Sequence, residues 1–305
     1  MNILVTGGAG YKGVILSHEL LKLGHNVTIM DNFMYGYEPV LFLTQYPNLN
    51  VLKKDIRNVE ESDLKEHDII YHLAGISGYP ACEANPHSAQ LINVEATKRM
   101  CTMLGREQMV IYASTTSFYG KSGNLCTEDT LIKPVSLYGI TKYEAEKFMM
   151  LREHSVALRF ATIFGVSPKM RTDLLVNDFT YKAVNDRCIV LFENTSKRTF
   201  IHIRDAIQAY LFVLDHYPSM KGNIFNVGDN NLNFTKQEIA EAISRETGCS
   251  IIDSSLDDFD ARNFEVSFDK IKALGYRVER TLDEGIKEMV KLYSFYRPFL
   301  TYRTI

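Results

Sequence analysis

The sequence predicts an α/β protein in which a doubly wound parallel sheet is followed by a smaller C-terminal domain. Short apolar runs typical of buried strands alternate with segments of helical periodicity through about the first 160 residues. A glycine-rich turn joins the first strand to the first helix, and acidic, small or hydroxyl-bearing residues follow the later strands. Repeated strand–helix units favour parallel strands joined by right-handed crossovers, with helices covering both faces of the sheet.

The first strand–helix unit carries a glycine turn with the spacing of a dinucleotide site. A buried strand is expected over 3–5 and a helix over 14–23, with Gly7, Gly10 and Gly13 between them. Glycines let the backbone approach a pyrophosphate, which then lies at the helix N-terminus and its positive dipole end. The unit therefore predicts a Rossmann-type sheet that binds a dinucleotide.

The second strand, over 27–30, ends at Asp31, and Asn32 follows it. An acid in this place accepts hydrogen bonds from the adenosine ribose hydroxyls and repels a 2′-phosphate. Since no arginine follows closely, the pattern favours NAD over NADP as the cofactor. Two residues of the turn, Tyr11 and Lys12, are also expected beside the cofactor. Lys12 either contacts a phosphate or lies in solvent, and the sequence leaves both readings open.

Later strands deliver further candidates to the same edge of the sheet, where the ligand crevice of open α/β sheets lies. These candidates are Asp55 and Ile56 after the strand near 51–52, Leu73, Ala74 and Gly75 in the strand 68–75, and Ser114, Thr115 and Thr116 after the strand 109–113. Asp55 is placed to meet the adenine amino group. A helix over 91–104 and a strand over 156–160 continue the alternation.

Tyr138 and Lys142 stand four residues apart on an expected helix, so the phenol and the ammonium share one face. A free tyrosine titrates near about pH 10 and is a poor base at neutral pH, whereas a nearby cation stabilises the phenolate. Lowering its pKa by about 3 units requires about 4 kcal/mol, which a partly desolvated cleft can supply. Such pairs are common on helices, but beside the glycine turn and Thr115 this one predicts a base for a sugar or alcohol hydroxyl.

Together these residues resemble the extended short-chain dehydrogenase/reductase family, the nucleotide-sugar epimerases and dehydratases, along most of the chain. The matches are the glycine signature at Gly7, Gly10 and Gly13, the ribose acid Asp31, the adenine contact Asp55–Ile56, the strand end 72–75, the helix asparagine Asn93, the catalytic Thr115, the Tyr138–Lys142 pair, and the phosphate arginines Arg198 and Arg262. Within the glycine signature, Lys12 stands where the family often has an apolar residue.

The resemblance implies NAD-dependent oxidation of a nucleotide-diphosphate sugar, usually at C4. It assigns Tyr138 as the base that removes the hydroxyl proton while hydride leaves the same carbon. It assigns Lys142 as the residue that lowers the tyrosine pKa and holds the nicotinamide ribose, and Thr115 as the hydrogen-bond partner of the reacting oxygen. It also implies a homodimer formed through the helices 91–104 and 136–152.

The expected domain organisation follows from the same resemblance. An NAD-binding domain is expected over 1–165, and a substrate domain is expected mainly over 166–305. Elements of about 198–228 are expected to return to the first domain, because this stretch resembles the strand that rejoins the main sheet.

Two departures from the family narrow the reaction. The 4,6-dehydratases carry an Asp-Glu pair directly after the catalytic threonine, and Thr116 and Ser117 stand there in this chain. Neither hydroxyl serves as a carboxylic acid or a carboxylate base at neutral pH, so oxidation or epimerisation at C4 is favoured over dehydration. Thr162 stands where the family often has an asparagine that binds the substrate. A dehydratase that uses acids from elsewhere and a non-catalytic dinucleotide-sensing protein are the alternatives.

Substrate contacts are expected from residues on several loops and strands. The candidates are Tyr79, Thr116, Thr162, Asn177, Arg198 and Arg262. The stretch 168–178 predicts either a cation from Met170-Arg171 near the sugar or diphosphate, or a helix that opens with Asp173 as its cap. The stretch also resembles a branch of the family that oxidises GDP-heptoses at C4 for surface polysaccharides.

Bulk composition excludes several other classes of function. The chain has 305 residues and a net charge of −3, so no general affinity for nucleic acid or for anionic membranes is expected. The apolar runs are too short to span a bilayer, and the N-terminus leads directly into a strand with no basic segment before it. Five scattered cysteines and eight histidines without metal-ligand spacing predict no metal site and fit a reducing cytoplasm.

Overall fold

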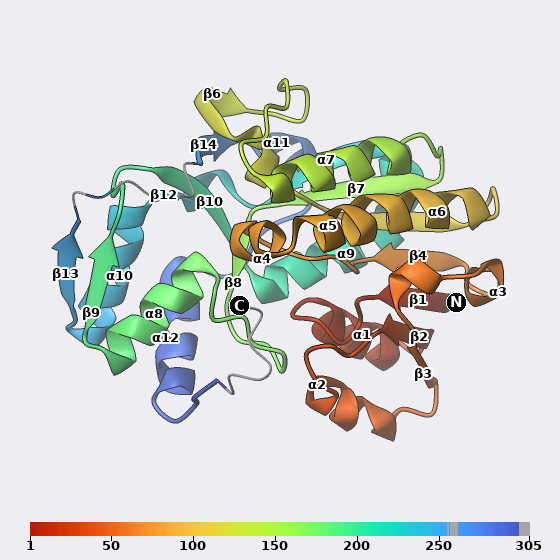
Figure 1. Cartoon of the computed structure of the whole chain (residues 1–305), viewed down its shortest axis with the longest axis horizontal. Coiled ribbons are helices and arrows are strands. Elements are labelled where there is room, and N and C mark those ends of the chain that lie inside the picture. The colour runs from red at the N-terminus through yellow and green to blue at the C-terminus, as the bar shows by residue number, and fades with distance from the viewer. Residues whose placement is uncertain (255, 257–261, 299–305) are drawn as a thin grey trace.

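The computed structural model describes residues 1–254, 256 and 262–298, and its main feature is a seven-stranded sheet (Figure 1). Every neighbouring pair of strands in this sheet is parallel, in the order β11-β7-β5-β4-β1-β2-β3. The strands are β1 Asn2–Thr6, β2 Asn26–Asp31, β3 Leu49–Lys53, β4 Ile69–His72, β5 Met109–Thr115, β7 Ser155–Phe160 and β11 Asn223–Val227. The order reverses between β1 and β4, which confirms the predicted doubly wound sheet and defines its ligand-binding switch point.

Helices cover both faces of this sheet, so its strands are apolar on both sides. They are α1 Gly13–Lys22 and α9 Ile203–Met220 on one face, and α6 Ala96–Met103 and α7 Leu137–Met149 on the other. In β1, Ile3 and Val5 enter the core beneath α1 and α9, while Leu4 enters the core beneath α6 and α7. This alternation explains why β1 reads as an unbroken apolar run.

The helix expected over 91–104 is regular only in its second half. A π-helical segment, η3 Gln90–Glu95, precedes α6 and contains Asn93. Widened turns of this kind occur frequently at functional sites, because they redirect one side chain out of the regular helical pattern.

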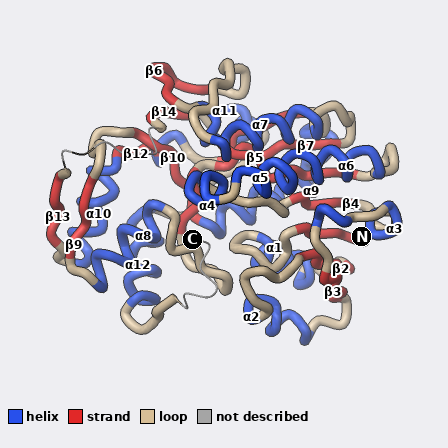
Figure 2. The backbone as a smooth tube through the Cα atoms, in the orientation of Figure 1, coloured by secondary structure: helices blue, strands red, loops and turns tan. Residues whose placement is uncertain are grey.

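A second core lies beside the sheet rather than on it, and Figures 1 and 2 show its elements grouped together at the left of the molecule. The group comprises α8 Leu175–Asn185, α10 Lys236–Thr247, α12 Leu282–Tyr293 and the strand pair β9 Cys188–Leu191 and β13 Ser250–Asp253. Val176, Ile239, Ile243, Ile286 and Met289 are buried in this core.

The chain crosses between the two cores more than once. Strand β10 Lys197–His202 pairs with β8 Thr162–Phe164 and β12 Asn233–Thr235, after which α9 and β11 lie on the large sheet. The remaining elements are α2 Glu38–Leu41, η1 Phe42–Gln45, η2 Ile56–Asn58, α3 Glu61–Leu64, α4 Tyr79–Ala84, α5 Pro86–Ala89, η4 Thr116–Tyr119, β6 Lys121–Cys126, η5 Asn230–Leu232, β14 Asn263–Val266 and α11 Asp269–Ala273. Among the described residues, no helix combines the length and apolarity needed to cross a bilayer.

Candidate active site

The main cavity opens at the carboxyl ends of the strands, on both sides of the switch point. Its wall is built from the glycine turn after β1, the ends of β2 and β3, the segment 73–78 after β4, and the ends of β5 and β7. Tyr138 of α7, the loop residues Lys169 and Arg171, and Arg262 complete the wall. The cavity therefore joins the glycine turn to Thr115 and Tyr138, while Lys142, the third expected catalytic residue, does not line it.

The glycine turn closes against the end of β4 so tightly that side chains are excluded. A Cβ on Gly13 would lie 2.2 Å from the Gly7 carbonyl oxygen, and a Cβ on Gly7 would lie 2.8 Å from the Ala74 nitrogen. Gly7 also has a left-handed φ of +68°, which a residue with a Cβ rarely adopts. The turn thus brings its backbone and the N-terminus of α1 directly to the cavity, as a pyrophosphate site requires.

Two carboxylates line the cavity at the ends of β2 and β3. Asp31 accepts hydrogen bonds from the backbone N–H groups of Ala9 and Phe33, at 3.0 and 2.9 Å, which fixes its orientation beside the turn. Burial raises the pKa of Asp31, and these two bonds oppose that rise. Asp55 accepts two bonds from the Arg57 guanidinium at 2.9 Å and one from Asn32, and they hold the pKa of Asp55 well below its usual range.

Asn93 supports the cavity wall through hydrogen bonds to Ile76, which lines the cavity. Its side-chain oxygen accepts a hydrogen bond from the Ile76 N–H at 2.8 Å, and its amide donates to the Ile76 carbonyl at 3.0 Å. The same amide donates to the Thr141 hydroxyl of α7 at 3.1 Å. Asn93 therefore connects the segment that lines the cavity to the helix that carries Tyr138.

Thr115 and Tyr138 lie close to each other in the wall of the cavity. Thr115 is the last residue of β5, and its hydroxyl oxygen accepts the Ser117 N–H at 3.1 Å. Because this oxygen accepts one hydrogen bond, the Thr115 hydroxyl proton remains to be donated to another group. A hydrogen bond from Thr115 to Tyr138 lowers the Tyr138 pKa and so favours the phenolate. Helix α7 begins next to Tyr138 because the Ser136 hydroxyl caps it by accepting the Gly139 N–H at 3.2 Å.

The pKa of Tyr138 is raised above its ordinary value and not lowered as the sequence predicted, because burial is the largest influence on it. The positive charge of Arg171 is the largest influence that opposes this rise. Arg171 forms an ion pair with Asp173 and donates to the Ser77 carbonyl at 3.3 Å. Asp173 is therefore the partner of Arg171 and does not cap α8, whose N-cap is Leu174. The sequence of 168–178 predicted a cation from Arg171 near the substrate, but it did not predict that this cation would lower the Tyr138 pKa.

Lys142 lies one turn after Tyr138 and is buried, with its ammonium 4.1 Å from the centroid of the Tyr112 ring. Burial, and secondly the charge of Lys12, lower the pKa of Lys142 to about 7. Glu146, on the same helix, opposes that change, although Glu146 is itself held by Arg159 at 2.7 Å. Within the described structure, Arg171 thus acts on Tyr138 more strongly than Lys142 does.

Of the six expected substrate contacts, Thr162 and Arg262 line the cavity, and Arg262 donates to the Ser117 hydroxyl. Tyr79, Thr116, Asn177 and Arg198 do not line it, and their contact with a substrate stays a prediction. The structure shows how two of these side chains, Thr116 and Asn177, are held. The Thr116 hydroxyl donates to the Phe160 carbonyl at 3.1 Å. Asn177 is fully buried, donates to the Arg171 carbonyl at 2.8 Å and accepts the Gly165 N–H at 3.1 Å.

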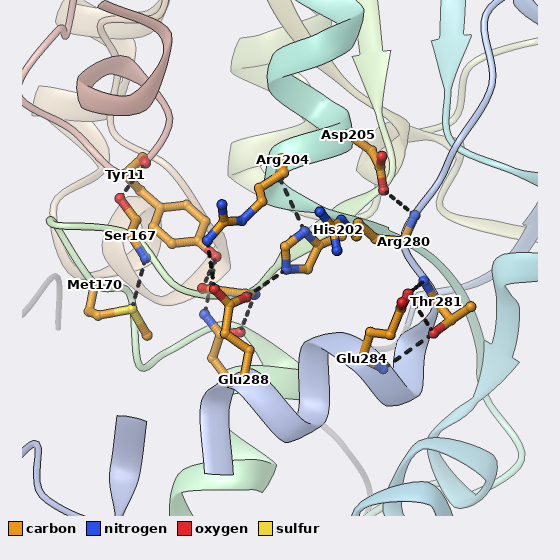
Figure 3. A network of polar contacts seen from close by, with 12 residues as sticks. Tyr11, Ser167, Met170, His202, Arg204, Asp205, Arg280, Thr281, Glu284 and Glu288 are labelled. Atoms are coloured by element: carbon orange, nitrogen blue, oxygen red, sulfur yellow. Dashed lines mark hydrogen bonds and ion pairs between the residues drawn. The ribbon is translucent and has the colours of Figure 1, made fainter. Parts of the chain in front are cut away.

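Tyr11 ties the glycine turn to the second core, and Figure 3 shows the surrounding network. Its hydroxyl donates to the Gly165 carbonyl at 2.7 Å, and its own carbonyl accepts the Ser167 hydroxyl at 2.8 Å. In the same network, Glu288 of α12 contacts His202 at 3.0 Å and accepts a hydrogen bond from Arg204 at 2.9 Å. The cofactor turn and the loop that carries Arg171 are consequently held as one unit.

Comparisons with known proteins agree with this geometry. Residues 3–228 match the model of the family described as "NAD dependent epimerase/dehydratase family". The chain belongs to this family. One relative, the uncharacterised UDP-glucose epimerase YtcB of Bacillus subtilis, is 31% identical over 247 residues, which are 75% of this chain and 77% of the relative.

Two solved structures of family enzymes have the same fold. The UDP-glucuronic acid 4-epimerase of Bacillus cereus, in complex with UDP-glucuronic acid and NAD, superposes with a TM-score of 0.86 at 24% identity, covering 96% of this chain and 99% of the other. TunA, an NAD-dependent NDP-hexosamine 5,6-dehydratase of tunicamycin biosynthesis, has a TM-score of 0.84 at 21% identity, covering 97% and 98%. The fold is therefore shared by enzymes with different reactions, and the fold alone does not select one of them.

NAD is the cofactor of this family enzyme, and the residues present fit it. The Gly7–Gly13 turn presents backbone at the N-terminus of α1 for the pyrophosphate, and Asp31 presents a carboxylate for the adenosine ribose. Among the described residues, no cluster of His, Cys, Asp or Glu could hold a metal ion. The glycine turn and Asp31 together therefore fit a bound dinucleotide.

Proposed function

We propose that the protein oxidises a nucleotide-diphosphate sugar at C4, with Tyr138 accepting the hydroxyl proton. NAD supplies the hydride acceptor for this reaction. The observation that carries the proposal is the placement of Thr115 and Tyr138, linked by a hydrogen bond, in the wall of the same cavity as the glycine turn. Thr115 would orient the reacting oxygen, and Arg171 would stabilise the phenolate as it accepts the proton.

The cations around the cavity support a substrate that carries a diphosphate. Arg262 and Lys169 both line the wall outside the glycine turn. A nucleotide diphosphate carries two negative charges next to the sugar, and arginine binds phosphate oxygens through two parallel N–H donors. We place the diphosphate against Arg262, which leaves the sugar between Thr162 and Tyr138.

The cavity supports oxidation or epimerisation over dehydration. Dehydration of the sugar requires an acid for the leaving hydroxyl and a base for a carbon-bound proton. In the part of the chain that the structure describes, Asp31 and Asp55 are the carboxylates that line the cavity, and both belong to its adenosine end. Beside Thr115, the Thr116 hydroxyl is engaged with a backbone carbonyl and the Ser117 hydroxyl with Arg262.

Two finer assignments belong to the proposal. The reaction either ends at a 4-keto sugar or continues by return of the hydride to the opposite face, which is 4-epimerisation; the Thr115–Tyr138–Lys142 site serves both. The resemblance of 168–178 to enzymes of GDP-heptose oxidation makes a GDP-heptose, used for surface polysaccharide, the first substrate to test. Location in the cytoplasm accords with five cysteines that are all unpaired.

We also propose that the protein forms a homodimer through α7. Ile140 and Phe148 of α7 are exposed by 41% and 38%, and Leu151, just after the end of the helix, is exposed by 81%. The neighbouring helix α6 packs beside α7 and would complete a four-helix interface with a second copy. Light scattering should show a dimer, and Ile140→Glu with Leu151→Glu should shift it to a monomer.

The experiment that tests the function is incubation with NAD and a panel of GDP-, UDP-, CDP- and dTDP-sugars, read by mass spectrometry and NMR. Loss of two hydrogens identifies the 4-keto product, and an unchanged mass with a new NMR spectrum identifies the epimer. Loss of water would refute the argument against dehydration. Tyr138→Phe should abolish turnover while retaining NAD, and near-normal turnover would refute the assignment of the base.

A further inference from the structure

Lys12, between Tyr11 and Gly13, is a cavity-lining residue whose role the proposed function does not use. Its ammonium nitrogen lies 4.7 Å from the centroid of the Phe160 ring and 5.7 Å from that of Tyr210. The side chain therefore runs from the glycine turn toward the end of β7. Among the described residues, no hydrogen bond or ion pair involves the Lys12 side chain, so aromatic rings take the place of a carboxylate around this cation.

The position of Phe160 places Lys12 at the reaction end of the cavity. In the parallel register of β5 and β7, Phe160 is the residue directly beside Thr115. Lys12 is also close enough to Lys142 that its charge is the largest cause, after burial, of the lowered Lys142 pKa. The Lys12 side chain thus starts in the glycine turn and ends at Phe160, next to Thr115 and within electrostatic reach of Lys142.

The chemistry of hydride transfer requires the nicotinamide ring at this same end. The hydride leaves the carbon whose hydroxyl proton goes to Tyr138, and transfer requires donor and acceptor carbons in close contact. A ring that accepts a hydride from a carbon held by Thr115 and Tyr138 must lie next to them. The pyrophosphate, in contrast, belongs to the backbone of the turn and the N-terminus of α1.

We propose that the Lys12 ammonium lies at the nicotinamide end of bound NAD and stabilises the reduced cofactor relative to the oxidised one. The proposal rests on the proposed function only for the place of the hydride transfer. The oxidised ring carries one positive charge and the reduced ring none, whereas the pyrophosphate is identical in both forms. A partly buried cation that has no carboxylate partner in the described part of the chain therefore repels the oxidised ring selectively. This raises the reduction potential of the bound cofactor and favours the oxidised sugar at equilibrium.

The size of the effect is set by one charge in a partly desolvated cavity. Interaction of two unit charges across a cavity of this kind, at an effective dielectric constant near about 20, corresponds to about tenfold in an equilibrium constant. For a two-electron couple, a tenfold change corresponds to about 30 mV in reduction potential. The effect requires a protonated amine, and burial and Arg171 lower the pKa of Lys12 to about 7. Measurements at pH 6 therefore keep Lys12 charged.

The test measures binding of NAD and of NADH separately, without sugar, to cofactor-stripped full-length protein at pH 6. NADH is followed by its fluorescence and NAD by competition, and the quantity compared is the ratio of the two dissociation constants. Lys12→Met should change this ratio about tenfold in favour of NAD. Lys169→Met is the matched control, because Lys169 lines the same cavity with its ammonium 4.8 Å from the Tyr35 ring, away from Phe160. The control should leave the ratio unchanged.

Two results would overturn the proposal. Equal weakening of NAD and NADH by Lys12→Met would place the ammonium on the pyrophosphate, and unchanged affinity for both would place it outside the cofactor site. Lys12→Gln serves as a second variant if Lys12→Met does not fold, and thermal unfolding of both checks this. Because no sugar is present, these results stand apart from the sugar panel: an inactive panel with a shifted ratio refutes the proposed function alone.

Discussion

Arg171 offers the sharpest test of how the site makes a base of Tyr138. Its guanidinium side chain is only 13% exposed, is paired with Asp173, and supplies the largest influence that lowers the Tyr138 pKa. Replacement by Met keeps most of the side-chain volume and removes the charge. We expect the Tyr138 pKa to rise, so the fraction of phenolate at neutral pH falls and kcat/KM at pH 7 falls on the order of tenfold.

The same replacement has a second, separable consequence for stability. Removal of one partner from a buried ion pair leaves the other uncompensated and costs about 3–5 kcal/mol. The double variant Arg171→Met with Asp173→Asn removes both charges, and we expect it to recover most of that loss because no unpaired carboxylate remains. Denaturant unfolding of the single and double variants measures this difference.

The pH profile of kcat/KM then isolates the catalytic effect. Activity rises with pH as Tyr138 loses its proton, so a raised pKa moves this acidic limb to higher pH. The double variant should fold like the wild type and still show the displaced limb, while Asp173→Asn alone should not displace it upward. An acidic limb at the wild-type pH in the double variant would refute the role of Arg171, whatever the change in stability.

Three further predictions follow from single contacts. Gly13→Ala places a Cβ 2.2 Å from the Gly7 oxygen, so NAD affinity measured by calorimetry should fall by at least about tenfold while the apo fold is retained. Asp31→Ser removes the carboxylate that repels a 2′-phosphate, so the ratio of NADP to NAD affinity should rise on the order of tenfold. The pKa of Lys142 is lowered to about 7, so above that pH the unfolded chain binds more protons than the folded one. The free energy of unfolding of the apo protein should therefore rise by about 1.4 kcal/mol per pH unit between about pH 7 and pH 10. Lys142→Met should remove this contribution.

The fold was predictable because its signals are local. Strand 3–5, the glycine turn and helix 14–23 are contiguous, and their periodicity and glycine spacing are readable without knowledge of distant residues. Asn93 was matched through the resemblance alone, and the groups that it holds, the Ile76 backbone and the Thr141 hydroxyl, became visible only in the structure. The regular helix expected over 91–104 was wrong in its first half, because a π-helical segment depends on packing against α7 that no local pattern reveals.

The electrostatics of the site were less predictable, because they depend on contacts between distant segments. Tyr138 and Lys142 stand four residues apart, and the pattern assigned the lysine as the main cation acting on the tyrosine. Arg171 takes that position from another loop, where Asp173 and the Ser77 carbonyl hold it. Asn177 was predicted as a substrate contact, which stays a prediction; its side-chain amide joins Gly165 to the backbone of Arg171 and so shapes the same loop.

The charges around the cavity divide into two groups, and this division connects cofactor binding to the reaction. The carboxylates Asp31 and Asp55 line the cavity at the ends of β2 and β3, whereas Arg171 acts on Tyr138 and on Lys12, and Lys12 acts on Lys142. Cations favour a phenolate base and a neutral, reduced nicotinamide. In the described structure no lining carboxylate lies beside Thr115, so the acid and the base that dehydration needs are absent there. If Tyr138 is the base and the nicotinamide lies beside it, as we propose, this one arrangement would promote removal of the proton and the hydride together and would disfavour the competing loss of water.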